Sequence, residues 1–375
     1  MASNCEYSNL LPKYKLYAFG SNGSGQLGIG HTEDVSLPEE CKGNWVSKCS
    51  TIRQLAGGGN HTIAVFTDRA FASVGDNRDG RCMTAQERQI HTTWQQYQFP
   101  PDFEMVFLGH VAATWSASFA TCEAETPYVS GTGNSGEIGL GPGISTTDGA
   151  FQVIEMNPRH EPVVKIVASM GHVVVVLESG EVWGWGRGRK GQLGRPAENM
   201  WRPRKFEDIL FKVVDAACGK DFTVLFGEPS KGELLVLGLA GSDRFGVKRD
   251  APDSLPGWKQ VAASWGSIYV LMESGELKAW GRNDHGQLPP SGLPLLDSIA
   301  AGSEHCLGLT RDGKVLAWGW GEHGNCGMPI DKNGDVKGRW NEIATVSQLP
   351  ASAVFAGCAT SFIVVQMPRL AGKPS

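Results

Sequence analysis

Residues 16–30 read LYAFGSNGSGQLGIG, a short apolar run that ends in Gly20 and is followed by Gly25 and Gly28. The same frame, a glycine after an apolar run and two turn positions five and eight residues later, returns six more times. These copies start at Gly75, Gly131, Gly186, Gly238, Gly281 and Gly319. Successive starts lie 55, 56, 55, 52, 43 and 38 residues apart. Self-similarity at such periods indicates a solenoid, an array or a propeller.

A second repeated element is a pair of small residues followed by a β-rich run, as in Ala56-Gly57 before residues 62–66. Its counterparts start at Ala112, Ala168, Cys218, Ala263, Ala301 and Ala356. Six of the seven pairs lead, 17 to 19 residues later, to one of the leading glycines. Turn signals such as the sequence ESGE at 178–181 lie between the two runs. Each unit is therefore expected to contain a β-hairpin.

The two ends of the chain carry the halves that lack a partner. Residues 16–20 have no preceding hairpin strand, and residues 362–365 have no following one. Pairing them would close a ring and leave no open sheet edge between first and last units. We predict an all-β fold, a closed seven-bladed β-propeller that forms one domain over residues 14–367. Residues 1–13 and 368–375 are expected to be flexible termini.

The repeat also carries recognisable motifs. They are AWGRNDHGQL at 279–288, VWGWGRGRKGQLG at 182–194 and AGSEH at 301–305. These stretches resemble the repeat of the regulator of chromosome condensation family. The resemblance spans nearly the whole chain and implies the propeller fold. It leaves function open, because the scaffold hosts exchange factors, photoreceptors, ligase subunits and inhibitors.

Composition narrows the class of protein. The chain has 34 basic and 39 acidic residues among 375, a net charge of −5, which argues against a protein that coats nucleic acid but permits a local basic patch. No apolar run approaches the 18 or so residues that a membrane helix needs. The first 15 residues lack the basic and apolar regions of a secretory signal.

The nine cysteines include no C-x-x-C pair, which argues against a zinc site and favours reduced thiols in a cytoplasmic or nuclear protein. Several turns match G-x-G-x-x-G, for example residues 186–191. A nucleotide site needs a helix directly after such a loop, whereas these motifs enter further loop. We therefore expect no cofactor and no metal.

Two tryptophans and two Glu-His pairs are candidate partner-binding residues. Trp115 and Trp265 follow small-residue pairs, which places them near one mouth of the propeller channel, as partner anchors or as packing residues. The pairs Glu304-His305 and Glu322-His323 could suggest acid-base or metal chemistry. A role in loop structure or partner contact is the stronger interpretation.

Two further stretches stand out. The segment 84–101 is expected to be a surface excursion, with a short helix possible in its first half, whose Trp94, Tyr97 and Phe99 either pack on a blade or anchor a partner. A basic stretch could bind an anionic partner or could be a solvated blade edge. It comprises Arg187, Arg189, Lys190, Arg195, Arg202, Arg204 and Lys205 around the single acid Glu198.

A finer resemblance rests on GWGEHGNCG at 319–327 and GCATSFI at 357–363, together with GDNR at 75–78 and GSEH at 302–305. These stretches are similar to a fungal killer-toxin-insensitivity branch of the same family. That resemblance implies a non-enzymatic propeller in a heterodimer with a small CSL-type zinc or iron protein, present in cytoplasm and nucleus. The partner serves diphthamide synthesis on elongation factor 2 and Elongator-dependent modification of wobble uridines in tRNA.

Other functions of the family remain as alternatives. The first is guanine-nucleotide exchange on a Ran-type small GTPase, although the first 15 residues offer only two lysines as a basic arm. An enzyme or a light sensor is the last alternative, and the Gly-Trp-Arg-His-Thr repeat of the plant ultraviolet-B receptor is absent from the sequence.

Overall fold

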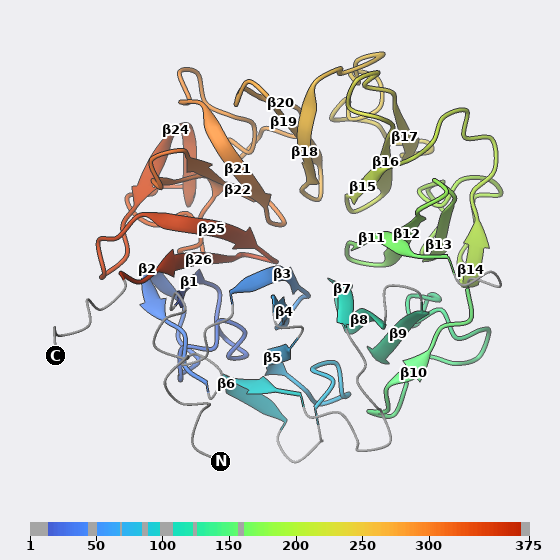
Figure 1. Cartoon of the computed structure of the whole chain (residues 1–375), viewed down its shortest axis with the longest axis horizontal. Coiled ribbons are helices and arrows are strands. Elements are labelled where there is room, and N and C mark those ends of the chain that lie inside the picture. Colours follow the sequence, from blue (N-terminus) through green and yellow to red (C-terminus); the bar gives the residue numbers. More distant parts are fainter. Residues whose placement is uncertain are drawn as a thin grey trace, which may run out of the picture.

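The fold is a ring of seven antiparallel sheets around a central axis (Figure 1). The computed structural model describes residues 14–43, 51–67, 70–84, 89–97, 108–122, 126–156 and 161–368. Within these ranges all of the regular elements are strands, and no helix is long and apolar enough to cross a membrane. The predicted all-β, seven-bladed propeller is confirmed. Residues 1–13 and 369–375 lie outside the described ranges, so the predicted flexible termini stay a prediction.

We number the blades along the chain. Blade 1 contains β3 (Ile52–Gly57), β4 (His61–Phe66), β5 (Phe71–Asp76) and β6 (Ile90–Gln96). Blade 2 contains β7 (Leu108–Ala113), β8 (Ala117–Cys122), β9 (Thr126–Gly131) and β10 (Gln152–Val153). Blade 3 contains β11 (Val163–Ala168), β12 (His172–Leu177), β13 (Val182–Gly186) and β14 (Met200–Lys205).

Blades 4 and 5 have three strands each, and the last two blades have four. Blade 4 contains β15 (Asp215–Cys218), β16 (Phe222–Phe226) and β17 (Leu234–Gly238). Blade 5 contains β18 (Trp258–Ala263), β19 (Ser267–Met272) and β20 (Leu277–Gly281). Blade 6 contains β21 (Leu296–Ala301), β22 (His305–Thr310), β23 (Val315–Trp320) and β24 (Asp335–Ile343). Blade 7 contains β25 (Ala351–Ala356), β26 (Thr360–Gln366), β1 (Tyr14–Gly20) and β2 (Val35–Glu40).

The ring closes between the two ends of the chain, as the sequence predicts. Strand β1 lies between β26 and β2, and its pairing runs from Tyr14 opposite Gln366 to Gly20 opposite Thr360. Blade 7 therefore draws its strands from both ends, and closure removes the edge that β26 would otherwise expose.

Small residues on the first strand of each blade allow the blades to approach one another at the axis. A Cβ on Gly57 would lie 2.7 Å from the Cα of Gly357 in blade 7, so this contact excludes a larger residue. Polar side chains join neighbouring first strands as well. Gln54 Nε2 donates to the Val111 carbonyl at 2.8 Å, and Gln260 Nε2 donates to the Ile299 carbonyl at 2.7 Å.

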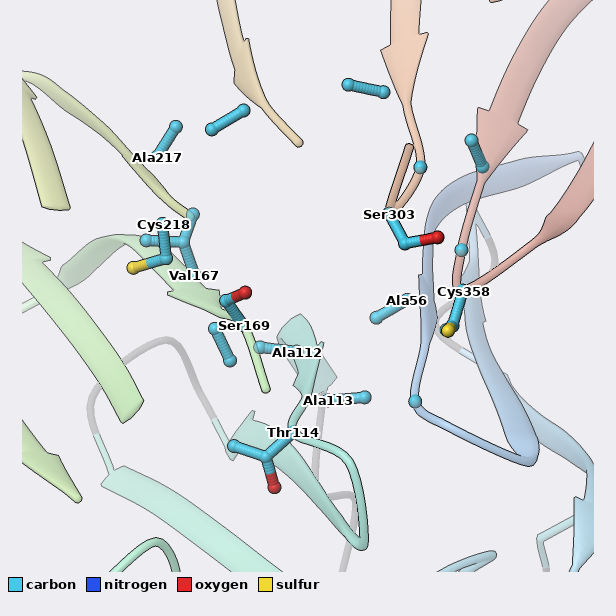
Figure 2. A pocket seen from close by; sticks show the side chains of 18 of the residues that line it. Ala56, Ala112, Ala113, Thr114, Val167, Ser169, Ala217, Cys218, Ser303 and Cys358 are labelled. Atoms are coloured by element: carbon cyan, nitrogen blue, oxygen red, sulfur yellow. The ribbon is translucent and has the colours of Figure 1, made fainter. Parts of the chain in front are cut away.

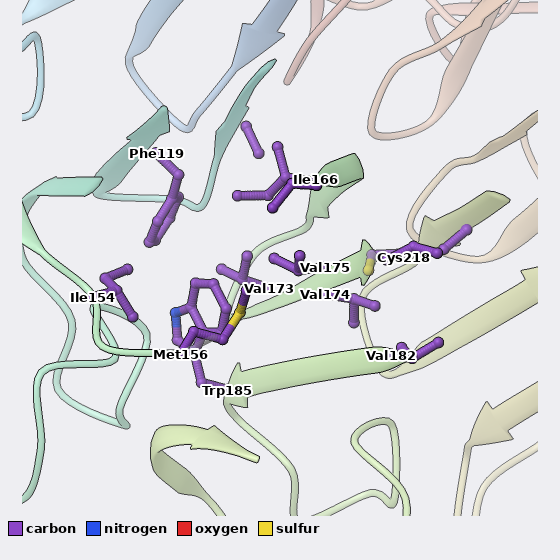
Figure 3. Packing of buried hydrophobic residues seen from close by; sticks show 14 of the residues in the cluster. Phe119, Ile154, Met156, Ile166, Val173, Val174, Val175, Val182, Trp185 and Cys218 are labelled. Carbon is purple, nitrogen blue, oxygen red and sulfur yellow. The ribbon is translucent and has the colours of Figure 1, made fainter. Parts of the chain in front are cut away.

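The hydrophobic core lies between adjacent sheets. Figure 3 shows one such cluster, in which residues of blades 2, 3 and 4 interdigitate around the indole of Trp185. The Trp185 ring packs against Phe119 with centroids 5.9 Å apart, and its Nε1 donates to the Glu137 carbonyl at 2.9 Å. Burial of the indole thus costs no hydrogen bond.

The segment 84–101 differs from its expected form. Its described residues 90–96 form β6, the outer strand of blade 1, rather than a surface excursion. Trp94 is buried beneath the first glycine turn, where a Cβ on Gly28 would collide with its ring. Tyr97 packs edge-on against Phe71. Both aromatics are therefore packing residues, and Phe99 lies outside the described ranges.

Candidate functional site

Two sets of loops share one face of the disc. The loop between the first and second strands of each blade lies beside the turn that follows the third strand, because these strands are antiparallel neighbours. Backbone bonds join the two sets, as where Trp320 N–H donates to the Glu304 carbonyl at 2.9 Å and Leu239 N–H to the Asp221 carbonyl at 3.1 Å. We call this side the loop face and the opposite side the hairpin face.

The first strands enclose a central channel of about 250 Å³ (Figure 2). Figure 2 shows short side chains such as Ala56, Ala113 and Ser303 around it, together with the thiols of Cys218 and Cys358. Burial raises the pKa of the Cys218 thiol to about 12 and raises that of Cys358 as well. Both thiols therefore stay protonated at neutral pH and are poor nucleophiles.

Trp115 and Trp265 both line this channel, as predicted from their places in the repeat. Their rings lie 6.2 Å apart between centroids, inclined at 41°, although they belong to blades 2 and 5. Trp115 is 40% exposed and Trp265 is half-buried. The ammonium of Lys220 lies 5.8 Å from the Trp265 ring centroid. The result is a partly exposed indole pair at one mouth of the channel.

Backbone bonds between blades hold the indole pair in place. Trp115 N–H donates to the Met170 carbonyl at 3.2 Å, and the Trp115 carbonyl accepts from Gly59 at 3.0 Å. Trp265 N–H donates to the Ser303 carbonyl at 2.9 Å. The pair is thus presented by loops that are fixed to their neighbours.

The structure corrects the partner-contact prediction for Glu304 and His305 and favours the alternative, a structural role. His305 is fully buried, with Nε2 2.9 Å from the Ser361 hydroxyl oxygen of blade 7. Glu304 is 3% exposed, and its carboxylate accepts hydrogen bonds from Arg282 and Gln287 of blade 5. Both side chains join blades internally, so neither offers a surface to a partner.

Glu322 and His323 are exposed on the turn after β23, on the loop face, and remain candidate contact residues. His323 Nδ1 lies 3.0 Å from an Asp34 carboxylate oxygen. Because His305 faces Ser361 and His323 faces Asp34, the two Glu-His pairs form no common acid-base site. No group of three His, Cys, Asp or Glu side chains among the described residues is arranged to hold a metal ion.

The predicted basic patch divides into two parts. Arg187, Arg189 and Lys190 are exposed on the turn after β13, on the loop face. Of these, Arg187 forms an ion pair with Glu137 of blade 2 at 3.0 Å. This part of the patch is available to an anionic partner.

The other part lies on β14, the outer strand of blade 3. Arg202 is exposed, but the Arg204 guanidinium donates to the Leu193 carbonyl at 2.8 Å, and burial lowers its pKa. Lys205 pairs with Glu181 at 2.6 Å, at the end of the strand near the hairpin face. The six cations therefore do not form one surface, because β14 carries Arg204 and Lys205 away from the loop face.

A set of buried pairs that join consecutive blades was not predicted from the sequence. In each pair a histidine at the start of a second strand lies against a hydroxyl of the next blade. The pairs are His61 and Ser118 at 2.8 Å, His172 and Thr223 at 3.0 Å, and His305 and Ser361 at 2.9 Å. The recurrence of histidine at one repeat position was the available signal.

A family model described as an RCC1-like domain matches residues 15–365. The chain belongs to this family. An RCC1 repeat-containing protein of Schizosaccharomyces pombe is 29% identical over 375 residues, covering 94% of this chain and 99% of the relative. A secretion-regulating guanine nucleotide exchange factor of Bos taurus is 27% identical over 285 residues, 75% of this chain and 51% of that protein.

The crystal structure of Prp20p from Saccharomyces cerevisiae has the same fold. It superposes with a TM-score of 0.79 at 21% identity, covering 98% of this chain and 96% of Prp20p. The report of that structure describes its binding to Gsp1p and histones. The resemblance to the regulator of chromosome condensation repeat, inferred above from motifs, is thus confirmed at the level of family and fold.

Proposed function

We propose that this RCC1-like propeller is a non-enzymatic scaffold that binds a small protein on its loop face. The observation that carries the proposal is the partly exposed Trp115 and Trp265 pair at the channel mouth. Large aromatics on a rigid surface are common anchors of protein interfaces. The absence of a catalytic role is supported by the channel itself, whose Cys218 thiol is protonated and whose Lys165 is paired with Asp215 at 2.7 Å.

The partner that we propose is a small CSL-type zinc protein, in a heterodimer. Two of the stretches that carry the finer family resemblance, 319–327 and 357–363, begin on the loop face, and Gly357 and Cys358 of the second line the channel. Such a complex would support Elongator-dependent modification of wobble uridines in tRNA and diphthamide synthesis on elongation factor 2. We propose the cytoplasm and nucleus as its location, because six of the cysteines in the described ranges are free thiols, namely Cys41, Cys82, Cys218, Cys306, Cys326 and Cys358.

A second candidate function is guanine-nucleotide exchange on a Ran-type small GTPase. It is favoured by the names of two similar proteins, the secretion-regulating guanine nucleotide exchange factor and Prp20p with its described binding to Gsp1p. The two candidates differ in a measurable activity, since exchange accelerates nucleotide release whereas scaffolding does not.

Calorimetric titration tests both candidates. The zinc protein and a Ran-type GTPase are titrated separately into wild type, Trp115→Ala and Trp265→Ala. Truncation of a buried interface tryptophan typically costs about 2 kcal/mol, so we expect the affinity for the zinc protein to fall about thirtyfold in each variant. Trp340→Ala serves as the control, because Trp340 is a half-buried residue of β24, outside the channel mouth.

Thermal melts establish that each variant is folded. Equal affinities in wild type and both channel variants would exclude the indole pair from the interface. If the wild type fails to bind the zinc protein but binds the GTPase and accelerates its nucleotide release, the second function replaces the first.

A further inference from the structure

Positive charge gathers on the loop face where blades 3 and 4 meet. Three segments form this region, which we call the blade 3–4 seam: residues 187–199, 219–221 and 239–250. They hold eight basic and four acidic side chains, in a chain whose net charge is −5. The basic residues are Arg187, Arg189, Lys190, Arg195, Lys220, Arg244, Lys248 and Arg249. The seam thus has the opposite sign to the protein as a whole.

Most of these cations have no acidic partner within the described residues. Arg187 pairs with Glu137 and Arg249 pairs with Asp250. The other six are exposed, and none of them forms an ion pair with another described residue. The Asp243 carboxylate accepts the backbone N–H groups of Lys248 and Arg249 at 3.1 and 2.8 Å rather than pairing with a cationic side chain of the seam.

Backbone atoms lie between the cations of the blade 3 turn and those of the blade 4 turn. The turns of blades 3 and 4 touch where Ala240 N–H donates to the Lys190 carbonyl at 2.9 Å. A Cβ on Gly191 would meet only the Cα of Gly238, at 3.8 Å, and a Cβ on Gly241 would meet no atom within 4 Å. The two glycines thus leave open space between the cations of the blade 3 turn and those of the blade 4 turn.

We propose that the blade 3–4 seam binds single-stranded nucleic acid through its phosphodiester backbone. A single strand carries one negative charge per nucleotide, and arginine presents a fork that matches phosphate oxygens. At the inner end, Lys220 lies beside Trp265, where a base can stack on the indole while its phosphate meets the ammonium. An acidic peptide would match the cations but offers no planar group to that indole.

This proposal does not depend on the protein partner proposed above. It is tested by fluorescence anisotropy with a labelled RNA 12-mer of mixed sequence, from 50 to 200 mM salt. Each phosphate contact contributes about −0.7 to the slope of log K against log salt for single strands. Six free cations thus limit the slope to about −4. We expect Lys190→Glu/Lys248→Glu to weaken binding about tenfold or more and to make the slope shallower by about 1.4.

The matched control is Lys231→Glu/Lys314→Glu, which makes the same change in net charge on hairpin turns of blades 4 and 6. Unlabelled RNA and DNA of the same sequence and a 12-residue Asp/Glu peptide serve as competitors. Displacement by DNA equal to that by RNA assigns recognition to the backbone, and preference for RNA assigns a contact to the 2′-hydroxyl. The proposal fails if the wild type does not bind RNA at 50 mM salt, if both double variants lose affinity equally, or if the peptide competes as well as the nucleic acids.

Discussion

Acid should unfold this propeller at a pH set by its buried histidines. In two of the three pairs the hydroxyl donates onward to a turn carbonyl, Thr223 to Gln192 and Ser361 to Asn325, each at 2.7 Å. Because this hydroxyl has donated its only hydrogen to the carbonyl, it can only accept a hydrogen bond from the Nε2–H group of the histidine. A neutral imidazole with its proton on Nε2 satisfies this contact. No hydrogen-bond acceptor within the described residues faces the Nδ1 atom of these histidines, where a second proton would bind.

The size of the effect follows from the pKa values. Burial lowers the pKa of His61 from 6.5 to about 3, and lowers those of His172 and His305 from 6.5 to about 4. Because the folded pKa lies below the unfolded one, the unfolded chain binds protons first as pH falls. The contribution of these neutral histidines to the free energy of unfolding is complete above pH 6.5. Below that pH it falls by about 1.4 kcal/mol per pH unit for each histidine. At pH 5.0 the three sites together would cost about 6 kcal/mol, comparable to the stability of a typical domain.

Urea unfolding between pH 7.5 and 5.0 measures this dependence. We expect His172→Gln to lower stability at pH 7.5 but to reduce the slope between pH 6.0 and 5.0 by about 1.4 kcal/mol per pH unit. Phe222→Leu is the matched control, because Phe222 holds the same repeat position in blade 4 and does not titrate. It should lower stability without changing the slope. A wild-type stability that is flat across this window would refute the reasoning, as would equal slopes for wild type and His172→Gln.

Two further predictions concern the ring and its turns. Deletion of residues 1–20 removes β1 and should cause aggregation or a large fall in melting temperature, because β26 loses its neighbour; an unchanged melting temperature would contradict closure. Gly136→Ala should destabilise well beyond the roughly 1 kcal/mol of left-handed strain, since φ is +89° and the new Cβ would lie 2.5 Å from the Met200 carbonyl oxygen. Gly191→Ala, at φ +81° in open space, should cost only that strain in urea unfolding, so equal losses would argue against the steric term.

The fold could be predicted because its constraints repeat in the sequence. The frame that begins at Gly20 recurs in phase with the small-residue pairs, and counting the unpaired halves leads to the pairing of β1 with β26. Strand β6 could not be found in this way. Its sequence IHTTWQQ lacks the glycine frame and gains its place from pairing with β5 and from burial of Trp94.

The site was predicted less completely, because burial of a polar side chain depends on distant residues. Glu304 is covered by Arg282, which comes from another blade, and nothing near Glu304 in the sequence indicates this. The prediction of one basic patch between Arg187 and Lys205 was incomplete for a related reason. Its members are close in sequence, but β14 extends toward the hairpin face and takes Lys205 to Glu181, while Lys220 and Lys248 join the remaining cations from blade 4.

The way in which the blades are joined also bears on the proposed function. A loop that orders only on binding loses conformational entropy, which reduces the net affinity of its contacts. Here the backbone of Trp115 is bonded to Met170 and that of Trp265 to Ser303, so both loops are fixed by neighbouring blades before a partner arrives. In the proposed complex, the loops that carry Trp115 and Trp265 are therefore already ordered before the partner binds. On the proposed function, side chains that join the blades to one another, such as Glu304, would contribute to recognition without touching the partner.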